Sequence, residues 1–274
     1  MNARLLVLGA SGLVVAIAAA VVVWPAGPEA GEVAEIALPV PPFPPRIAEG
    51  ETYERCLSLL AEDPSGASAL AEGWQGKGGG DGAAQCQALA QIALGHPGVG
   101  ADLLEALAGR RPPGDRARAS LLGQAAQARL MGGDAGRALD DAGQAIAAAP
   151  DDVDLLLVEA NAADALDRPA VAIETLNRAL ALDPRRVDAL VLRAGSWRRL
   201  EQVDHAMADV DRAIELDPDE PEALLERGIL RQRRGDRAGA EADWRHARQV
   251  DPNGTVADLA EQNLALLEAG PDRR

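Results

Sequence analysis

A proline recurs at one fixed interval through the carboxy-terminal half of this 274-residue chain. Three of the four prolines directly follow an Asp, in the sequences ALDP, ELDP and QVDP. Because proline lacks an amide N–H and disfavours a helical conformation of the preceding residue, each one marks a point where one helix ends and the next begins. The sequence therefore predicts a row of equivalent units. Their prolines are Pro150, Pro184, Pro218 and Pro252.

Small and apolar residues recur with the same period. Each proline is preceded at fixed distances by a Leu, then by an Ala or Gly, and then by two further Ala. Small residues let two helices approach closely, and Leu fills the space between them. The pattern predicts an all-α chain of helix-turn-helix units. The columns are Leu122, Leu156, Leu190 and Leu224; Ala126, Ala160, Ala194 and Gly228; Ala138, Ala172, Ala206 and Ala240; and Ala145, Ala179, Ala213 and Ala247.

A 34-residue helix-turn-helix unit with these columns resembles the tetratricopeptide repeat (TPR) family. The resemblance implies a TPR α-solenoid over residues 116–252, with repeats at 119–152, 153–186, 187–220 and 221–254. Residues 254–269 are then expected to form a capping helix over the last apolar face. At the positions where the family has aromatic residues, this chain mostly has non-aromatic ones. We therefore expect cores with little aromatic packing (lean cores), with Trp197 and Trp244 packed inside.

Residues 50–115 repeat the rhythm less faithfully and resemble two degenerate helical hairpins. Helices are expected at 51–62, about 66–76, 83–94 and 99–108, followed by a slight bend or hinge at 110–115. The glycine-rich run around Lys77 is interpreted as a connector, because a phosphate-binding loop requires Ser or Thr after the lysine and a preceding strand.

The amino-terminal segment 1–24 sets the expected location. Residues 5–24 carry no charge and are long enough to cross a bilayer as a helix, so residues 1–24 are either a signal anchor or a cleaved signal peptide. The Pro-rich residues 25–49 are expected to be a spacer. With Arg4 before the apolar run and no cation after it until Arg46, the bulk is expected on the periplasmic side of a bacterial inner membrane. Cleavage would instead release it into the periplasm.

Cys56 and Cys86 are the only cysteines. They lie on the expected leading helices of successive hairpins, which stack side by side in such arrays. In an oxidising compartment they can form a structural disulfide, and the alternative is a pair of buried free thiols. Their spacing excludes a CxxC redox motif.

The composition argues against several functions. A formal net charge of -16 is the wrong sign for binding nucleic acid. His96, His205 and His246 occupy unrelated positions without acidic neighbours at ligand spacing, so we expect no metal. We find no nucleophile motif and no pattern that identifies a cofactor site, so catalysis is not expected.

The family resemblance places a partner-binding groove along the first helix of each repeat. Carried onto this chain, it implies a groove suited to an extended or helical peptide. Its acidic edge is Asp154, Asp188 and Glu222, its basic edge is Arg198, Arg199 and Arg233, and its apolar floor is Leu157, Val191, Leu225 and Ile229. The implied groove residues are Asp154, Leu157, Asn161, Asp188, Val191, Arg198, Arg199, Glu222, Leu225, Ile229, Gln232 and Arg233.

The function expected from the sequence is a non-enzymatic scaffold or adaptor for protein or peptide partners. The alternative is a periplasmic assembly chaperone that binds many exported chains, because an apolar groove permits both. An enzyme is the least favoured class, since no motif supports one.

Overall fold

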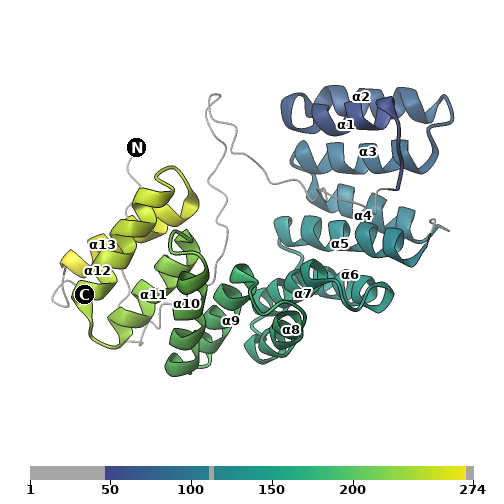
Figure 1. Cartoon of the computed structure of the whole chain (residues 1–274). Helices are drawn as coiled ribbons and strands as arrows, with labels where there is room; N and C mark the ends of the chain where they lie inside the picture. Colours follow the sequence, from purple (N-terminus) through teal and green to yellow (C-terminus); the bar gives the residue numbers. More distant parts are fainter. Residues whose placement is uncertain (1–46, 111–113, 270–274) are drawn as a thin grey trace, which may run out of the picture. The chain divides into compact units, whose positions relative to one another are not determined.

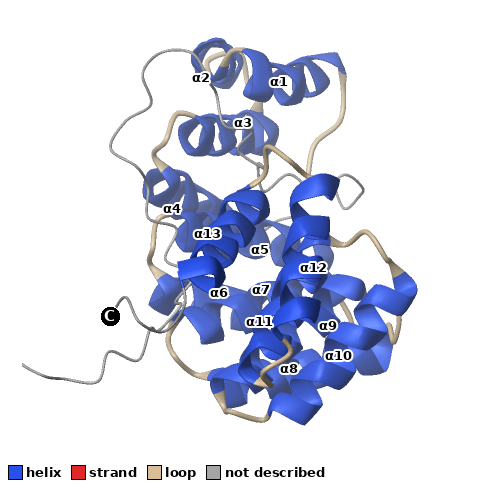
Figure 2. Ribbon diagram, turned by 90° about the vertical axis from the view of Figure 1, so that its left-hand side faces the viewer, coloured by secondary structure: helices blue, strands red, loops and turns tan. Residues whose placement is uncertain are grey.

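A computed structural model describes residues 47–110 and 114–269, which form thirteen α-helices and no strand (Figures 1 and 2). In chain order they are α1 (Glu51–Glu62), α2 (Pro64–Gln75), α3 (Gly80–Ala93), α4 (Pro97–Ala108), α5 (Asp115–Met131), α6 (Ala135–Ala148), α7 (Val153–Ala165), α8 (Pro169–Leu182), α9 (Val187–Arg199), α10 (Val203–Leu216), α11 (Pro221–Arg233), α12 (Arg237–Val250) and α13 (Thr255–Ala269). None of these helices combines the length and apolarity needed to cross a bilayer. The expected anchor or signal segment, 1–24, lies outside the described residues.

The helices pair as antiparallel hairpins, and each hairpin packs on the next (Figure 1). We call the odd-numbered helix of each hairpin its first helix and the even-numbered one its second helix. The first helices α5, α7, α9 and α11 each also contact the next first helix, ending at α13, as α1 contacts α3. From α5 onward they therefore form one continuous layer, which is the layer that carries the groove residues.

Proline and aspartate set the helix boundaries. Each second helix from α6 to α12 ends just before a proline of the period, with a single residue between them. Asp63, Asp134 and Asp236 cap helix starts by accepting a backbone N–H. Helices α2 and α4 begin slightly earlier than expected, because Pro64 and Pro97 fit the first helical position, where no N–H bond is lost.

The turn inside each regular repeat has one residue in the left-handed region. These residues recur at the repeat period: Gly133 (φ 76°), Asp167 (φ 58°), Glu201 (φ 60°) and Gly235 (φ 83°). Glycine adopts this conformation without penalty, whereas a residue with a Cβ is strained there. The middle two repeats therefore keep the turn geometry at a cost in conformational free energy at Asp167 and Glu201.

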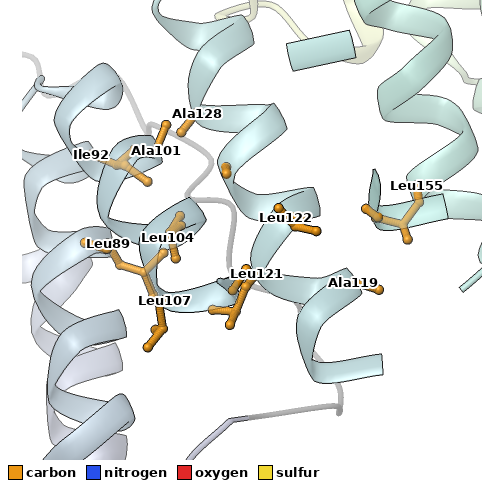
Figure 3. Close-up of a cluster of buried hydrophobic side chains, with 14 of the residues drawn as sticks. Leu89, Ile92, Ala101, Leu104, Leu107, Ala119, Leu121, Leu122, Ala128 and Leu155 are labelled. Atoms are coloured by element: carbon orange, nitrogen blue, oxygen red, sulfur yellow. The ribbon is translucent and has the colours of Figure 1, made fainter. Parts of the chain in front are cut away.

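The largest core cluster has buried members on every helix from α1 to α8, and Figure 3 shows part of it, from Leu89 of α3 to Leu155 of α7. It includes Leu89 of α3, Leu104 of α4, and Leu121 and Leu122 of α5, all almost completely buried. A shared core thus ties the degenerate hairpins to the regular repeats. The expected bend at 110–115 includes residues 111–113, which lie outside the described residues, and α4 and α5 on either side pack directly against each other.

The fourth repeat shows how a lean core accommodates one large side chain. Trp244 is fully buried and donates its indole N–H to the carbonyl of Leu225 (3.2 Å). Gly228 faces it across the hairpin, and a Cβ at that position would lie 2.3 Å from the Trp244 Nε1. Glycine thus replaces alanine in the repeat whose second helix carries a tryptophan at this contact. The other repeats have Ala there, opposite Ala142, Leu176 and Val210.

The first two hairpins are joined by uncharged and covalent links. Cys56 of α1 and Cys86 of α3 form a buried disulfide with their Cα atoms 6.1 Å apart. Beside it, Tyr53 donates to Gln85, and the Gln85 amide donates to Gln124 Oε1 of α5 (2.9 Å). These side chains connect three successive first helices through the core.

Candidate functional site

The residues implied as groove positions lie on α7, α9 and α11, and most are exposed or half-buried. Leu157 differs, because it is only 7% exposed and packs into a core cluster with Leu190 of α9. It supports the floor from beneath and does not line it. Asp154, Asn161, Asp188, Glu222, Gln232 and Arg233 are exposed, and Val191, Arg198, Arg199, Leu225 and Ile229 are half-buried.

The apolar floor follows one repeat position, the fifth. Along the array this position is Gly123, Leu157, Val191 and Leu225, each one repeat period after the last. The side chain at this position packs toward the next first helix: a Cβ on Gly123 would lie 2.5 Å from Leu155 of α7. Val191 and Leu225 keep part of their surface open, so the apolar floor is most accessible on α9 and α11.

The basic edge is largely engaged within the protein. Arg198 is 14% exposed in its side chain and pairs with Glu226 of α11. Arg199 donates to the carbonyl of Asp164 (2.8 Å) and to Asp167 Oδ1 (2.6 Å). These two arginines therefore link adjacent first helices, and Arg233 is the exposed cation of the three, with one long bond to the carbonyl of Arg198 (3.4 Å).

Burial also affects a carboxylate beneath the basic edge. Asp164 Oδ1 is buried and lies 3.6 Å from Arg199 Nη1, an ion-pair distance longer than a hydrogen bond. Burial raises the pKa of Asp164, and the nearby Arg199 guanidinium opposes the rise. Its role is to hold Arg199 between α7 and α9 and not to face a partner.

The acidic edge contains two unlike junctions. At the α7–α9 junction, Arg186 bonds both Asp188 (2.8 Å) and Asp154 (2.6 Å), and these contacts raise the pKa of Arg186 despite partial burial. One repeat later the same position is Glu220. Burial, then Glu222 and other carboxylates, raise the pKa of Glu220 to about 7. An arginine clamp at one junction is thus replaced by a carboxylate cluster at the next.

A column of buried polar residues on the second helices was not found from the sequence. Its members recur at the repeat period, and three of the four are aspartates that receive guanidinium groups from the first helix of their own repeat. Counting Asp by the proline period would have found them. The column is Asp141, Thr175, Asp209 and Asp243; Arg129 bonds Asp141 (3.0 Å), Arg193 bonds Asp209 (2.6 and 2.8 Å), and Arg227 and Arg231 bond Asp243 (2.7 to 3.0 Å).

A second missed feature is on α13, which was interpreted from the sequence only as a cap. One repeat period after Leu225, Ile229 and Gln232 lie Leu259, Asn263 and Leu266. Leu259 is 47% exposed and Leu266 64% exposed. The columns that define the groove therefore continue onto the last helix, where their apolar side chains are most open.

His96 and His205 are exposed, His246 is half-buried, and Trp197 is half-buried against a core cluster. His246 lies 2.9 Å from Asp219, and His205 stacks on Trp197 with ring centroids 4.8 Å apart. Among the described residues, no three His, Cys, Asp or Glu side chains are grouped so that they could hold a metal ion. What the implied groove on α7, α9 and α11 offers chemically is contact surface, namely apolar patches between carboxylates and the exposed Arg233.

Comparison with known proteins supports the fold. No protein-family model matches the chain, and no curated protein matches its sequence. The described fold is similar to one chain in the structure of the APC/C hetero-tetramer Cut9–Hcn1 (TM-score 0.60, 14% identity, covering 78% of this chain and 42% of that chain). It is also similar to TTC0263, a TPR protein of Thermus thermophilus (0.56, 21%, 69% and 100%), and to MamA (0.52, 16%, 60% and 94%). The expectation of an all-α TPR-like solenoid is thereby confirmed.

Proposed function

We propose that this protein is a non-enzymatic scaffold that binds protein or peptide partners on the face formed by its first helices. The observation that carries this proposal is the apolar column on three successive first helices, formed by the half-buried Val191 and Leu225 and the exposed Leu259 and bordered by charged residues. A peptide with apolar anchors spaced along its length can place one on each helix.

The charged border supports selectivity. Asp188, Glu222 and Arg233 are exposed beside the floor. Arg198 and Arg199 are bound within the array, and Arg186 pairs with Asp154 and Asp188, so the acidic part of the border is the junction of Glu220 and Glu222. We expect partners with Lys or Arg beside their apolar anchors, because unlike charges steer association and like charges oppose it.

The cellular part of the proposal rests on the amino-terminal sequence. An apolar segment followed by a Pro-rich spacer supports a single-pass inner-membrane protein whose helical array faces the periplasm, or an exported protein after cleavage. Identification of the first residue of the purified protein by mass spectrometry distinguishes these two forms.

Site-specific photo-crosslinking in cells tests the binding proposal. A photoreactive amino acid placed at Val191 or Leu225 should give discrete adducts, whereas one at Glu174 of α8 or Arg212 of α10, both exposed on second helices, should not. One dominant partner indicates an adaptor, and a broad set of exported proteins indicates a chaperone. Equal crosslinking from both helix layers would contradict a binding face on the first helices.

A further inference from the structure

The charged residues at the start of the first helices differ between successive junctions of the array. At the α7–α9 junction, Arg186 donates from Nε to Asp188 (2.8 Å) and from Nη2 to Asp154 (2.6 Å). Its guanidinium thus bonds two carboxylates that occupy the same repeat position on adjacent first helices. This contact shows which chemical group fits between carboxylates at that position.

The next junction, between α9 and α11, has equivalent carboxylates and no arginine. One repeat period after Asp154 and Asp188 lie Asp188 and Glu222. The residue equivalent to Arg186 is Glu220. Neither Glu220 nor Glu222 forms an ion pair with another described residue, and Asp188 accepts from Arg186 through Oδ1 alone. We call Asp188, Glu220 and Glu222 the carboxylate junction.

Apolar side chains lie one helical turn beyond these carboxylates, on the same face. Val191 follows Asp188 by three residues on α9, and Leu225 follows Glu222 by three residues on α11. Residues three apart on a helix are surface neighbours, and both Val191 and Leu225 are half-buried. Since α9 and α11 contact each other, a ligand that crosses from one to the other meets apolar surface and the carboxylate junction together.

We infer that the carboxylate junction binds an arginine side chain of the partner, which takes the position that Arg186 occupies one repeat earlier. An apolar residue two positions from that arginine lies on Val191 and Leu225, because alternate side chains of an extended peptide share one side. This inference rests on the proposed function and deepens it. It names the partner residue that decides selectivity and the three side chains that select it.

The electrostatics of the junction favour a cation. The strongest charged influences on Glu220 are all carboxylates, namely Glu222, Asp217 and Asp188. Together with burial, which is the largest cause, they raise the pKa of Glu220 to about 7. A cation among these groups relieves their mutual repulsion.

The geometry favours a guanidinium over a metal ion or an ammonium group. The described residues contain no three His, Cys, Asp or Glu side chains close enough together to hold a metal ion. Arg186 reaches carboxylates of two helices through two different nitrogens, which suits a planar guanidinium better than a compact ammonium. We therefore expect the carboxylate junction to prefer arginine to lysine.

Three extended fluorescent peptides provide the test. Each has leucines at positions i and i+2, and position i+4 is arginine, lysine or citrulline, which has the shape of arginine without its charge. Binding to the full chain is measured by fluorescence anisotropy. We expect the arginine peptide to bind about five-fold or more tightly than the citrulline peptide, with the lysine peptide between them. Equal affinity of the arginine and citrulline peptides, or no binding of any peptide, would overturn the inference.

A substitution within the chain sharpens the test. Glu220→Arg supplies from the chain itself the guanidinium that we assign to the partner, as Arg186 does at the previous junction. The difference in affinity between the arginine and citrulline peptides should then disappear. Glu174→Arg makes the same change in net charge at an exposed position of α8, on a second helix, and should keep that difference. Thermal unfolding followed by circular dichroism verifies that both variants are folded.

The outcomes distinguish this inference from simpler explanations and from the proposed function. An equal loss of arginine preference in Glu220→Arg and Glu174→Arg would indicate general charge attraction and refute the carboxylate junction as a site. Discrete adducts from Val191 in cells, combined with no arginine preference among the peptides, would leave the binding face standing and refute the carboxylate junction alone. Absence of both adducts and peptide binding would refute both proposals.

Discussion

The amino-terminal hairpins and the regular repeats stabilise similar helix packing by different means. In α1–α4, the two first helices are linked by a disulfide and by the neutral hydrogen bond from Tyr53 to Gln85, which in turn bonds Gln124 of α5. Three of the four regular repeats instead join their two helices by a guanidinium bonded to a buried aspartate, as in Arg227 and Asp243. Alanine-rich interfaces bury little area per residue, so specific links determine which helix faces meet. Variants in the two regions should therefore lower stability by different amounts and in different parts of the structure.

The largest expected effect is on the amino-terminal side. Replacing Cys56 and Cys86 by Ala, or reducing the disulfide, should lower the free energy of unfolding of α1–α4 by about 3 to 4 kcal/mol, because a closed loop of this length restricts the unfolded chain. Hydrogen exchange read by mass spectrometry should show faster exchange in α1–α3 with little change in α9–α12. Detection of two free thiols in protein from an oxidising compartment would contradict the disulfide itself.

Removing a buried carboxylate should have the next largest effect. Asp243→Ala leaves Arg227 and Arg231 without their shared partner, and we expect a loss of about 3 kcal/mol in urea unfolding. Thr175→Val changes the same repeat position where no arginine is bound, and should cost about 1 kcal/mol. Equal losses from the two variants would show that the arginine bonds are not what distinguishes the regular repeats.

A smaller effect should depend on pH. The pKa of Glu220 is raised to about 7 in the folded state, above its ordinary value of 4.5, so the folded protein binds more protons in this range than the unfolded chain. The stability that the protonated carboxyl contributes is complete below about pH 4.5 and is lost as the pH rises through 7. Glu220→Gln should therefore raise stability at pH 8 by about 1 kcal/mol or less, given solvent screening, with almost no change at pH 4.5.

Glu222→Gln serves as the matched variant for that titration, because it removes the carboxylate nearest to Glu220 and should reduce the same pH dependence. Thermal unfolding measured between acidic and mildly basic pH provides both curves. Parallel curves for the wild type and Glu220→Gln would contradict the raised pKa of Glu220.

The smallest expected effect is at the repeat turns. Glu201→Gly should raise stability by about 0.5 kcal/mol, because relief of the left-handed strain is partly offset by the greater freedom of glycine in the unfolded chain. Asp167→Gly relieves the same strain but removes the bond to Arg199, so its gain should be smaller or reversed. Calorimetric melting temperatures compare the two variants; an equal gain from both would show that the Arg199 contact contributes nothing.

The helix boundaries and the helix faces that pack together could be predicted from the sequence. Proline acts directly on the residues around it, so the helix boundaries follow from Pro150 and its equivalents with little information about packing. The small-residue columns likewise identify the helix faces that meet, because few residue types permit close approach.

What could not be predicted depends on partners distant in the sequence. Arg198 was assigned to an open groove edge because of its repeat position, but its position relative to Glu226 on the next first helix decides that it is engaged. Similarly, Asp140 and Asp141 are adjacent in the sequence, and only the packing shows that Asp141 is buried while Asp140 is exposed. The exposed leucines of α13, Leu259 and Leu266, were missed because the groove positions were carried only as far as the fourth repeat.

The fit of Trp244 against Gly228 determines which pieces of this array are interchangeable. Transplanting α9 into the place of α11 would carry a methyl group, that of Ala194, into space that the indole ring occupies. Transplanting the hairpin α9–α10 as a whole would bring Val210 with it and keep the match. The unit that can be exchanged between repeats is therefore the whole helical hairpin. Recombination with a breakpoint inside a hairpin separates residues that depend on each other.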